Sequence, residues 1–437
     1  TMNSLEQLEA FRQSVYLLLG NGRDALFDLM DATLVSRNVS SFVELSLSPV
    51  FRRQWSSVYA AVSDSSITEQ TLMKVYMQQL PRQAPIVLAG DHTAWSRPYA
   101  VTLKDRTYEH QAQPLSGSKP VTVGQGYSTL AWIPEDQGSW AVPLLHQRIT
   151  SFDSPIRLAA TQLKMTCEQL PPGCLRPLSL WDAEYGCAPF MQETATIECD
   201  KLIRLRPNRV LYAAAPDYCG KGRPRKHGAK FKLNDEQTWW TADQCLDVET
   251  EAWGTVRVQC WQTLHFAQSP SHPMHLLRIE RRSPDRSHRP LWLIWVGQTL
   301  PPLQELWQRY LRRFAVDHWY RFLKQRLHWT LPQFATPEQS QTWSHLMPLL
   351  TWQLWLARAC VTQSPLPWQK FLSHPSPGRV ADSFAALLVR LGSPASDPKP
   401  RGKSSGWLLG RVRARRVRYP TVKKGFKPVK KTAKHTA

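Results

Sequence analysis

The sequence lacks any apolar run long enough to cross a membrane. No window among its 437 residues approaches 18 consecutive apolar side chains. The opening stretch, "TMNSLEQLEAFRQS", is polar and carries acids, which is not typical of a secretory signal or a transit peptide. These absences exclude an integral membrane protein and predict a cytoplasmic chain that makes no contact with a membrane.

Paired cysteines are also missing. The eight cysteines are scattered, none forms a CxxC pair, and none has a histidine at a spacing typical of zinc sites. A chain of this length with that pattern is expected to keep its cysteines reduced. No internal repeat and no convincing serine or cysteine nucleophile motif is present. Covalent catalysis is therefore not indicated.

Acidic residues are in short supply, and positive charge is abundant. The chain has 55 Lys and Arg against 34 Asp and Glu, a net charge of +21. Residues 399–437 hold 14 of the cations and no acid, so the remainder carries 41 − 34 = +7. Such a balance favours a polyanion as partner, with nucleic acid ahead of a membrane surface. The alternative is a tail that only keeps the protein soluble.

The pattern of apolar residues changes along the chain and predicts an α/β protein. Helical periodicity is followed by short strand-like runs, by alternating segments and by further helical patterns. The predicted division is a helical N-terminal region at 1–82, the first part of a catalytic core at 83–200, a β-rich insertion at 201–290, the second part of the core at 291–365, and a loop-rich, basic tail at 366–437 that is disordered in isolation.

The order of elements in the core predicts a specific topology. Three strand-like stretches within 85–149 precede a helical stretch, "PIRLAATQLKMTCEQL", and a further strand, "LRPLSLW". Three strands, a helix and a strand follow each other in this way in RNase-H-like folds. The expected fold is therefore an RNase-H-like mixed sheet flanked by helices.

Two aspartates each end an apolar, strand-like run. Asp91 follows "PIVLAG" and Asp182 follows "LSLW". In open α/β sheets, ligands gather at the carboxyl ends of the strands. Carboxylate oxygens are the ligands that hard divalent cations prefer, and two such ions can support cleavage of a phosphodiester. One aspartate in this context could be a turn residue or a helix cap, but two predict a metal site.

A third carboxylate stands in a long helical pattern between about Leu303 and Trp329. Assuming 100° per residue, Tyr310, Arg313, Asp317 and Lys324 share one narrow face, which Arg321 extends. Leu311, Ala315, Trp319, Phe322 and Leu323 fall toward the opposite face, which is expected to pack. A solvated face with a salt bridge would explain the stripe alone. Together with the two strand-end aspartates, it favours a carboxylate flanked by phosphate-binding cations.

With these motifs, the chain resembles a DDE transposase of a bacterial insertion sequence. The matching residues are Asp91 in "LAGDHT", Asp182 in "LWDAEYG" and a Tyr-x2-Arg-x3-acid-x6-Lys signature at 310–324, within a resemblance that covers roughly 85–362. The signature acid is usually Glu, and here it is Asp317, which reaches about 1.3 Å less. Glu184 and Asp105 are nearby acids that rank below Asp317.

The resemblance implies an enzyme that cleaves transposon ends and joins the freed 3′-hydroxyl to target DNA. Asp91, Asp182 and Asp317 would bind two Mg²⁺ ions, for which Mn²⁺ can substitute. Arg313 and Lys324 would hold phosphates, and Tyr310 could donate a hydrogen bond to one. The implied partners are double-stranded DNA (terminal inverted repeats and target) and a second copy of the chain on DNA, in the bacterial nucleoid. The alternatives are a transposase-derived DNA-binding protein without catalysis and an RNase-H-like nuclease without strand transfer.

The insertion carries a further basic motif and a pair of tryptophans. "GKGRPRKHG" resembles an AT-hook core, which can lie in a narrow minor groove, although an ordinary basic loop on phosphates is the alternative. Either reading makes Arg223, Arg225 and Lys226 DNA contacts.

Trp239 or Trp240 could stack on a flipped base at the cleaved end, as an insertion-domain Trp does in related transposases, but core packing is the more common role of Trp.

Overall fold

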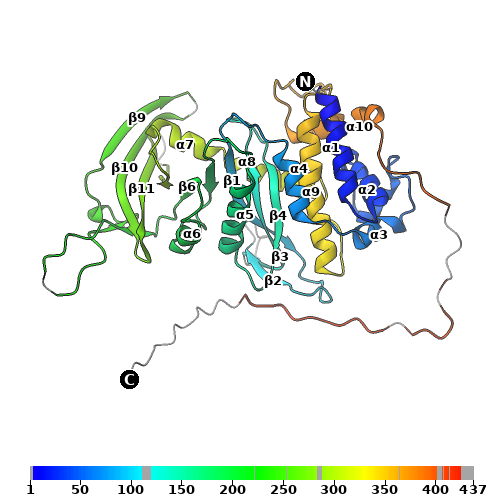
Figure 1. The fold of residues 1–437 in the computed structure, drawn as a ribbon, viewed down its shortest axis with the longest axis horizontal. Helices are drawn as coiled ribbons and strands as arrows, with labels where there is room; N and C mark the ends of the chain where they lie inside the picture. Colours follow the sequence, from blue (N-terminus) through cyan, green and yellow to red (C-terminus); the bar gives the residue numbers. More distant parts are fainter. Residues whose placement is uncertain are drawn as a thin grey trace.

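The computed structural model describes residues 3–110, 120–220, 222–251, 253–282, 288–363, 365–400, 406, 408–412 and 414–424. Three parts lie side by side along the long axis (Figure 1). Helices from the N-terminal region stand at one end, a sheet with its covering helices lies in the middle, and long antiparallel strands form the other end. No helix within the described residues is both long and apolar enough to cross a membrane.

The N-terminal region is helical, as predicted. It consists of α1 (Ser4–Leu18), α2 (Arg23–Val35), the 3-10 helix η1 (Phe42–Leu47), α3 (Ser56–Asp64) and α4 (Glu69–Met77). Asn3 caps α1 by accepting hydrogen bonds from the backbone of its first turn, and Glu6 completes the capping box. A buried ion pair of 2.8 Å joins Arg12 of α1 to Asp31 of α2 and fixes these helices against each other.

The central sheet has the RNase-H-like topology that the sequence predicted. Its strands are β1 (Val87–Ser96), β2 (Thr107–His110), β3 (Val121–Trp132), β4 (Val142–Ile149), β5 (Leu178–Trp181) and β6 (Asp200–Arg204). The strand β1 pairs antiparallel with β3 and parallel with β5, β3 pairs antiparallel with β4, and β5 pairs parallel with β6. The short strand β2, on the far side of β3, forms an edge.

Helices cover this sheet and join it to the N-terminal region. The helix α5 (Pro155–Gln169) packs on β3 and β4, and α9 (Pro337–Ala357) lies between β4 and α1. The Ser-Pro start predicted for α5 is present, since the Ser154 hydroxyl accepts a hydrogen bond from the Arg157 backbone. The helix α9 is buried along most of its length because it is enclosed by the sheet and the helical region.

The insertion extends the central sheet. Its strands are β7 (Val210–Tyr212), β8 (Lys230–Lys232), β9 (Gln244–Thr250), β10 (Gly254–Phe266) and β11 (Ser269–Arg282). The chain then returns through β12 (Leu291–Val296), which pairs with both β11 and β6. Core and insertion strands therefore share one hydrogen-bonded sheet. Two short elements complete this part: α6 (Ala188–Glu193) and the 3-10 helix η2 (Glu236–Thr238).

The structure corrects two predictions about helices. The pattern from Leu303 to Trp329 forms two helices, α7 (Leu303–Leu311) and α8 (Phe314–Gln325), rather than one. Backbone bonds at the junction span three residues, as in Arg313 N–H to the Tyr310 carbonyl, so the chain turns more tightly there. The region predicted to be loop-rich also contains α10 (Pro377–Leu391), whose apolar side chains at Val380, Phe384 and Leu387 pack onto neighbouring helices.

Candidate active site

Asp91 lies within a strand and not at its end. We predicted that the first strand stops at this residue, but β1 continues to Ser96 because Thr93, Ala94 and Trp95 pair with β3. The preceding residue, Gly90, lies under the indole of Trp181, and a Cβ at this position would come within 2.0 Å of that ring. Glycine therefore allows β1 and β5 to pack closely beside the carboxylate.

Asp182 lies where the sequence predicted it, directly after β5. The register of the parallel pair matches Gly90 with Trp181. Asp91 and Asp182 each follow directly after this last matched pair, on neighbouring strands whose usual spacing is about 4.8 Å. The chain then turns, with the Tyr185 N–H donating to the Asp182 carbonyl. The two aspartates thus meet at one edge because adjacent parallel strands carry them.

Arg313 joins the third aspartate to the first. It sits at the start of α8, almost fully buried, and its guanidinium donates to Asp91 at 3.2 Å and to Asp317 at 3.0 Å. Asp317 is one turn further along the same helix, and its side chain is 47 % exposed. The shorter side chain of Asp317 still reaches Arg313, so two of the three expected carboxylates share this cation.

Burial and charge act against each other in this cluster. Burial raises the pKa of Asp91 to about 6, although the positive charges of Arg313 and His92 oppose that rise. Burial would lower the pKa of Arg313, but the surrounding acidic groups, which include all three aspartates, raise it well above its usual range. The guanidinium therefore stays charged and compensates the carboxylates.

The donor set fits a hard divalent cation. All three side chains offer carboxylate oxygens, which Mg²⁺ prefers. One Asp182 oxygen, Oδ1, is buried and accepts no hydrogen bond, with Arg204 Nη1 at 3.5 Å as its ionic neighbour. Across the described ranges, no three His, Cys, Asp or Glu side chains are arranged to hold one metal ion together. In this conformation Arg313 supplies the positive charge between Asp91 and Asp317.

The predicted cationic stripe is only partly exposed. Tyr310 is buried, its hydroxyl forms no hydrogen bond with the part of the chain that the structure describes, and the tight turn before α8 separates it from the later residues. Lys324 is half-buried and donates to Thr93 at 2.7 Å, two residues beyond Asp91 on β1. Arg321 is exposed and makes no ion pair within the described residues. On the face of the helix that was predicted to pack, Ala315, Trp319 and Leu323 are buried.

Sequence reasoning missed Tyr320, which lies beside the aspartates. The Tyr320 hydroxyl lies within hydrogen-bond distance of both the Asp91 carbonyl and the Thr129 hydroxyl, which ties α8 to β1 and β3. His92 lies 3.6 Å from Glu184, the acid that we ranked below Asp317. Nothing in the local sequence marks Tyr320, because its role depends on a strand far away in the chain. The other lower-ranked acid, Asp105, pairs instead with Arg148 at 2.6 Å.

The two insertion motifs lie in different environments. Arg223, Arg225 and Lys226 are exposed in the loop between β7 and β8 and form no ion pair among the described residues. Trp239 instead packs among Phe231, Trp261 and Trp292, and its indole N–H donates to the Lys232 carbonyl. Trp240 lies edge-on to Phe231 in the same cluster. Both indoles are half-buried, so this packing leaves part of each side chain exposed.

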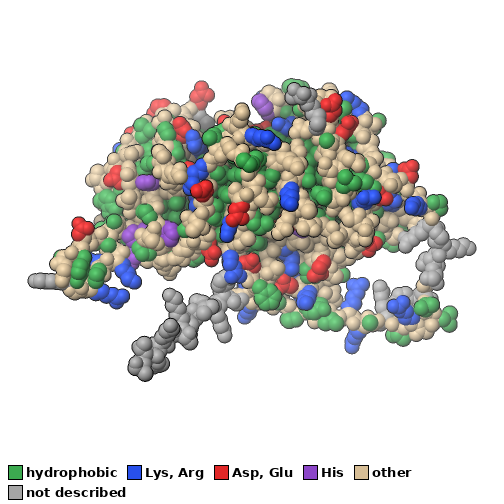
Figure 2. Space-filling view, viewed as in Figure 1, with side chains coloured by type: hydrophobic (Ala, Val, Ile, Leu, Met, Phe, Trp, Pro, Cys, Tyr) green, Lys and Arg blue, Asp and Glu red, His purple; other side chains and the backbone are tan. Residues whose placement is uncertain are grey.

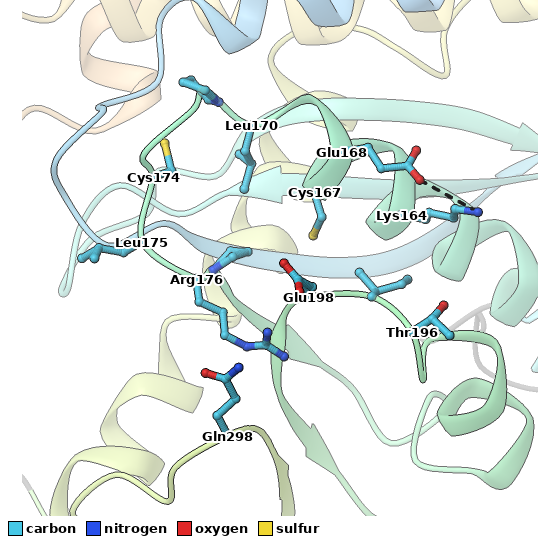
Figure 3. Close-up of a pocket in the computed structure, with 13 residues that line it drawn as sticks. Lys164, Cys167, Glu168, Leu170, Cys174, Leu175, Arg176, Thr196, Glu198 and Gln298 are labelled. Carbon is cyan, nitrogen blue, oxygen red and sulfur yellow. Dashed lines mark ion pairs between the residues drawn. The ribbon is translucent and has the colours of Figure 1, made fainter.

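A pocket of about 560 Å³ lies at the other end of the sheet. It is lined by Lys164, Cys167 and Glu168 of α5, the loop before β5, and Glu198 before β6 (Figure 3). The Lys164–Glu168 ion pair crosses one side of it. Since these residues precede β5 and β6, the pocket lies at the amino ends of the parallel strands and contains none of the three aspartates.

Comparison with known proteins identifies a family. The model of a family described as DDE superfamily endonuclease matches residues 18–263, which is more than half of the chain. The match includes Asp91 and Asp182 and ends before Asp317. No curated protein matches the chain.

Proposed function

We propose that this protein, which belongs to the DDE superfamily endonucleases, is a transposase. It would cleave DNA at transposon ends and join the resulting 3′-hydroxyl to target DNA, with divalent metal ions as cofactors. Membership of the family supports an endonuclease or transposase acting on DNA in general. Strand transfer, two Mg²⁺ ions and the roles of individual residues are the specific content of the proposal.

The arrangement of the carboxylates carries this proposal. Asp91 and Asp182 are adjacent through the register of β1 and β5, and Asp317 is linked to Asp91 through Arg313. Three acids from positions 91, 182 and 317 thus gather on the side of the sheet where α8 packs on β1. A purely structural cluster would not need a buried Asp182 oxygen that accepts no hydrogen bond within the described residues, together with a carboxyl, Asp91, whose pKa burial raises to about 6.

The chain's own residues would bind and orient the reacting groups. Asp91, Asp182 and Asp317 would hold the metal ions, and Arg313 would keep Asp91 and Asp317 aligned until they are bound. When bound, two divalent ions supply the charge that favours attack by an oxygen and departure of another at the phosphodiester. Lys324, held by Thr93, points a cation to the C-terminal half of β1, where a DNA phosphate can bind.

The DNA would extend from this site toward the insertion. Arg321 on α8 and the loop cations Arg223, Arg225 and Lys226 are exposed and are available for phosphates. Tyr310 would reach a phosphate only after it leaves its buried position. Two transposon ends must be brought together for joining, so we propose that the chain acts as a homodimer on DNA.

The test is a cleavage assay on the DNA ends of the element that encodes the chain. Purified protein with Mg²⁺ should nick these ends to leave a 3′-hydroxyl and then produce joined products with a supercoiled target plasmid. EDTA should abolish both products. Cleavage without joined products would instead identify a nuclease, and specific binding without cleavage, with Mg²⁺ or Mn²⁺, would identify a DNA-binding protein and refute catalysis.

A further inference from the structure

A basic segment near the C-terminus is attached to the edge of the central sheet. Residues 414–424, called the docked segment below, run beneath the molecule and reach β2 (Figure 1). Val422 forms a parallel bridge with Thr107, and its N–H donates to the Arg106 carbonyl at 2.7 Å. Three residues before Val422, the Tyr419 N–H donates to the Val101 carbonyl at 2.8 Å. The segment thus adds a short strand-like contact to an otherwise open edge.

Charges buried in the core hold this attachment. The Glu109 carboxylate on β2 is buried, and Lys424 at 2.6 Å is its only ion-pair partner among the described residues. Without the docked segment this carboxylate would be left buried without a counter-charge, which is costly. The buried Arg106 donates to the Tyr419 carbonyl at 3.2 Å from the core side. The core therefore contains groups whose partners are supplied by the segment.

The remaining cations of the docked segment face solvent. Arg415, Arg416, Arg418 and Lys423 are exposed and form no ion pair with the described residues. Lys and Arg side chains are visible along this lower edge of the molecule in Figure 2. Arg416 also lines a pocket of about 310 Å³ with Ser96, at the end of β1, and with the exposed Tyr99. A row of unpaired cations on an anchored, extended backbone suits a regularly spaced series of phosphates.

The docked segment lies at the end of the sheet toward which β1 runs from the aspartates. Ser96 is five residues beyond Asp91, about 17 Å along a strand. From β1, the pairing Ser96–Gly124, Gly124–Thr107 and Thr107–Val422 crosses three strand spacings, about 14 Å. The straight-line separation is roughly 22 Å, equal to about six base pairs at 3.4 Å each.

We propose that the docked segment is a fixed DNA-binding arm. It would grip the phosphates of a duplex about six base pairs from the bond held at Asp91 and Asp182. This inference rests on the proposed function for the position of the DNA, but the gripping surface itself needs no catalysis. The contact is with phosphates alone, so it adds affinity and direction to the bound duplex without reading its sequence.

Two variants test the arm by measuring DNA binding in EDTA with a 40-base-pair duplex at several salt concentrations. The first is Arg415→Ala/Arg416→Ala/Arg418→Ala/Lys423→Ala. Four lost phosphate contacts should reduce the slope of log affinity against log salt by about 3.6, at 0.9 per contact. The matched control is Lys74→Ala/Arg82→Ala/Lys370→Ala/Arg390→Ala, which removes four exposed cations elsewhere and should change the slope by less than about 1.

The second variant, Val422→Pro, keeps every charge but removes the N–H that anchors the segment. This variant should reduce the slope of log affinity against log salt by at least about 1, because the cations of a detached segment lose their fixed spacing. Its control is Val417→Pro, at an exposed residue whose N–H makes no hydrogen bond within the described residues, and this variant should bind like the parent. Thermal unfolding confirms that each variant is folded.

The proposal is overturned if the four-fold variant has the slope of its control, or if Val422→Pro binds like Val417→Pro. These outcomes leave the proposed function untouched, because cleavage with Mg²⁺ is measured separately. Conversely, a parent chain that cuts no DNA but shows both slope differences refutes the proposed function and supports the arm.

Discussion

Cations serve different purposes in the core and in the insertion. In the core, Arg313 is nearly fully buried and lies between two aspartates, so its charge fixes the position of other groups. In the insertion, Arg223, Arg225 and Lys226 are exposed on a loop and compensate no acid among the described residues. The comparison separates charge that builds the site from charge that is available to a partner. Four experiments test this distinction.

The largest effect is expected at Asp182. Replacing it by Asn should lower DNA cleavage by at least about 1000-fold, equal to about 4 kcal/mol, because under the proposed function one metal-binding carboxylate is lost. Glu184→Gln is the matched control two residues away and should retain cleavage within about 5-fold, equal to about 1 kcal/mol. Rates of nicking with Mg²⁺ measure both. Equal losses in the two variants would contradict the assignment of Asp182.

Arg313→Gln should destabilise the fold by roughly 3–5 kcal/mol, because Asp91 and Asp317 lose their shared counter-charge. Arg321→Gln, on the exposed side of α8, should change stability by less than about 0.5 kcal/mol. Denaturant unfolding measures both. In the double variant Asp91→Asn/Arg313→Gln much of the loss should disappear, since the uncompensated buried carboxylate is gone. If the double variant instead lost as much stability as Asp91→Asn and Arg313→Gln lose separately, added together, Arg313 would not act through Asp91.

Glu69 extends the comparison to a half-buried acid that forms no ion pair within the described residues. Burial raises its pKa to about 7, although a hydrogen bond from Gln147 lowers it. The folded chain therefore keeps a proton that the unfolded chain releases near pH 4.5. Stability from this group is complete below pH 4.5, falls between pH 4.5 and 7, and is lost above that, by up to about 3 kcal/mol. Glu69→Gln should flatten the profile of unfolding free energy against pH in this window, and an unchanged profile would exclude Glu69 as its cause.

The smallest effect on the protein itself is expected in the insertion loop. Arg223→Ala/Arg225→Ala/Lys226→Ala should leave the free energy of unfolding within about 0.5 kcal/mol. The same variant should reduce the salt slope of DNA binding by about 2.7, for three lost phosphate contacts. The triple variant Lys74→Ala/Arg82→Ala/Lys370→Ala controls for net charge. A loss of stability comparable with that of Arg313→Gln would remove the distinction between the two regions.

The sequence predicted the topology better than the exact position of each side chain. Runs of apolar residues and their order were enough for an RNase-H-like sheet, since strand pairing follows from those patterns. The end of β1 was misplaced because Asp91 and His92 interrupt the apolar pattern, although pairing with β3 continues through them. The helix α10 was missed because the sequence around it is basic and rich in proline, and its own amphipathic pattern is short.

Local sequence patterns predicted only part of the candidate site. Asp182 was placed correctly because a four-residue strand ends directly before it. The prediction of an exposed stripe was only partly correct. It assumed one continuous helix with 3.6 residues per turn, whereas the chain turns more tightly at Arg313. Tyr310 was therefore expected on the surface and is buried. Contacts such as Tyr320 to Asp91 join segments more than 200 residues apart, and no spacing rule can predict them.

The shared sheet of core and insertion has a mechanical consequence. Because β12 is hydrogen-bonded to β6 on one side and to β11 on the other, continuous sheet pairing joins the described strands of the two parts. A load applied to the loop between β7 and β8 would reach β5, and hence Asp182, as a change in strand twist. Under the proposed function, the insertion would then act as a rigid extension of the sheet, which would keep a constant distance between the cut bond and any DNA bound at the loop.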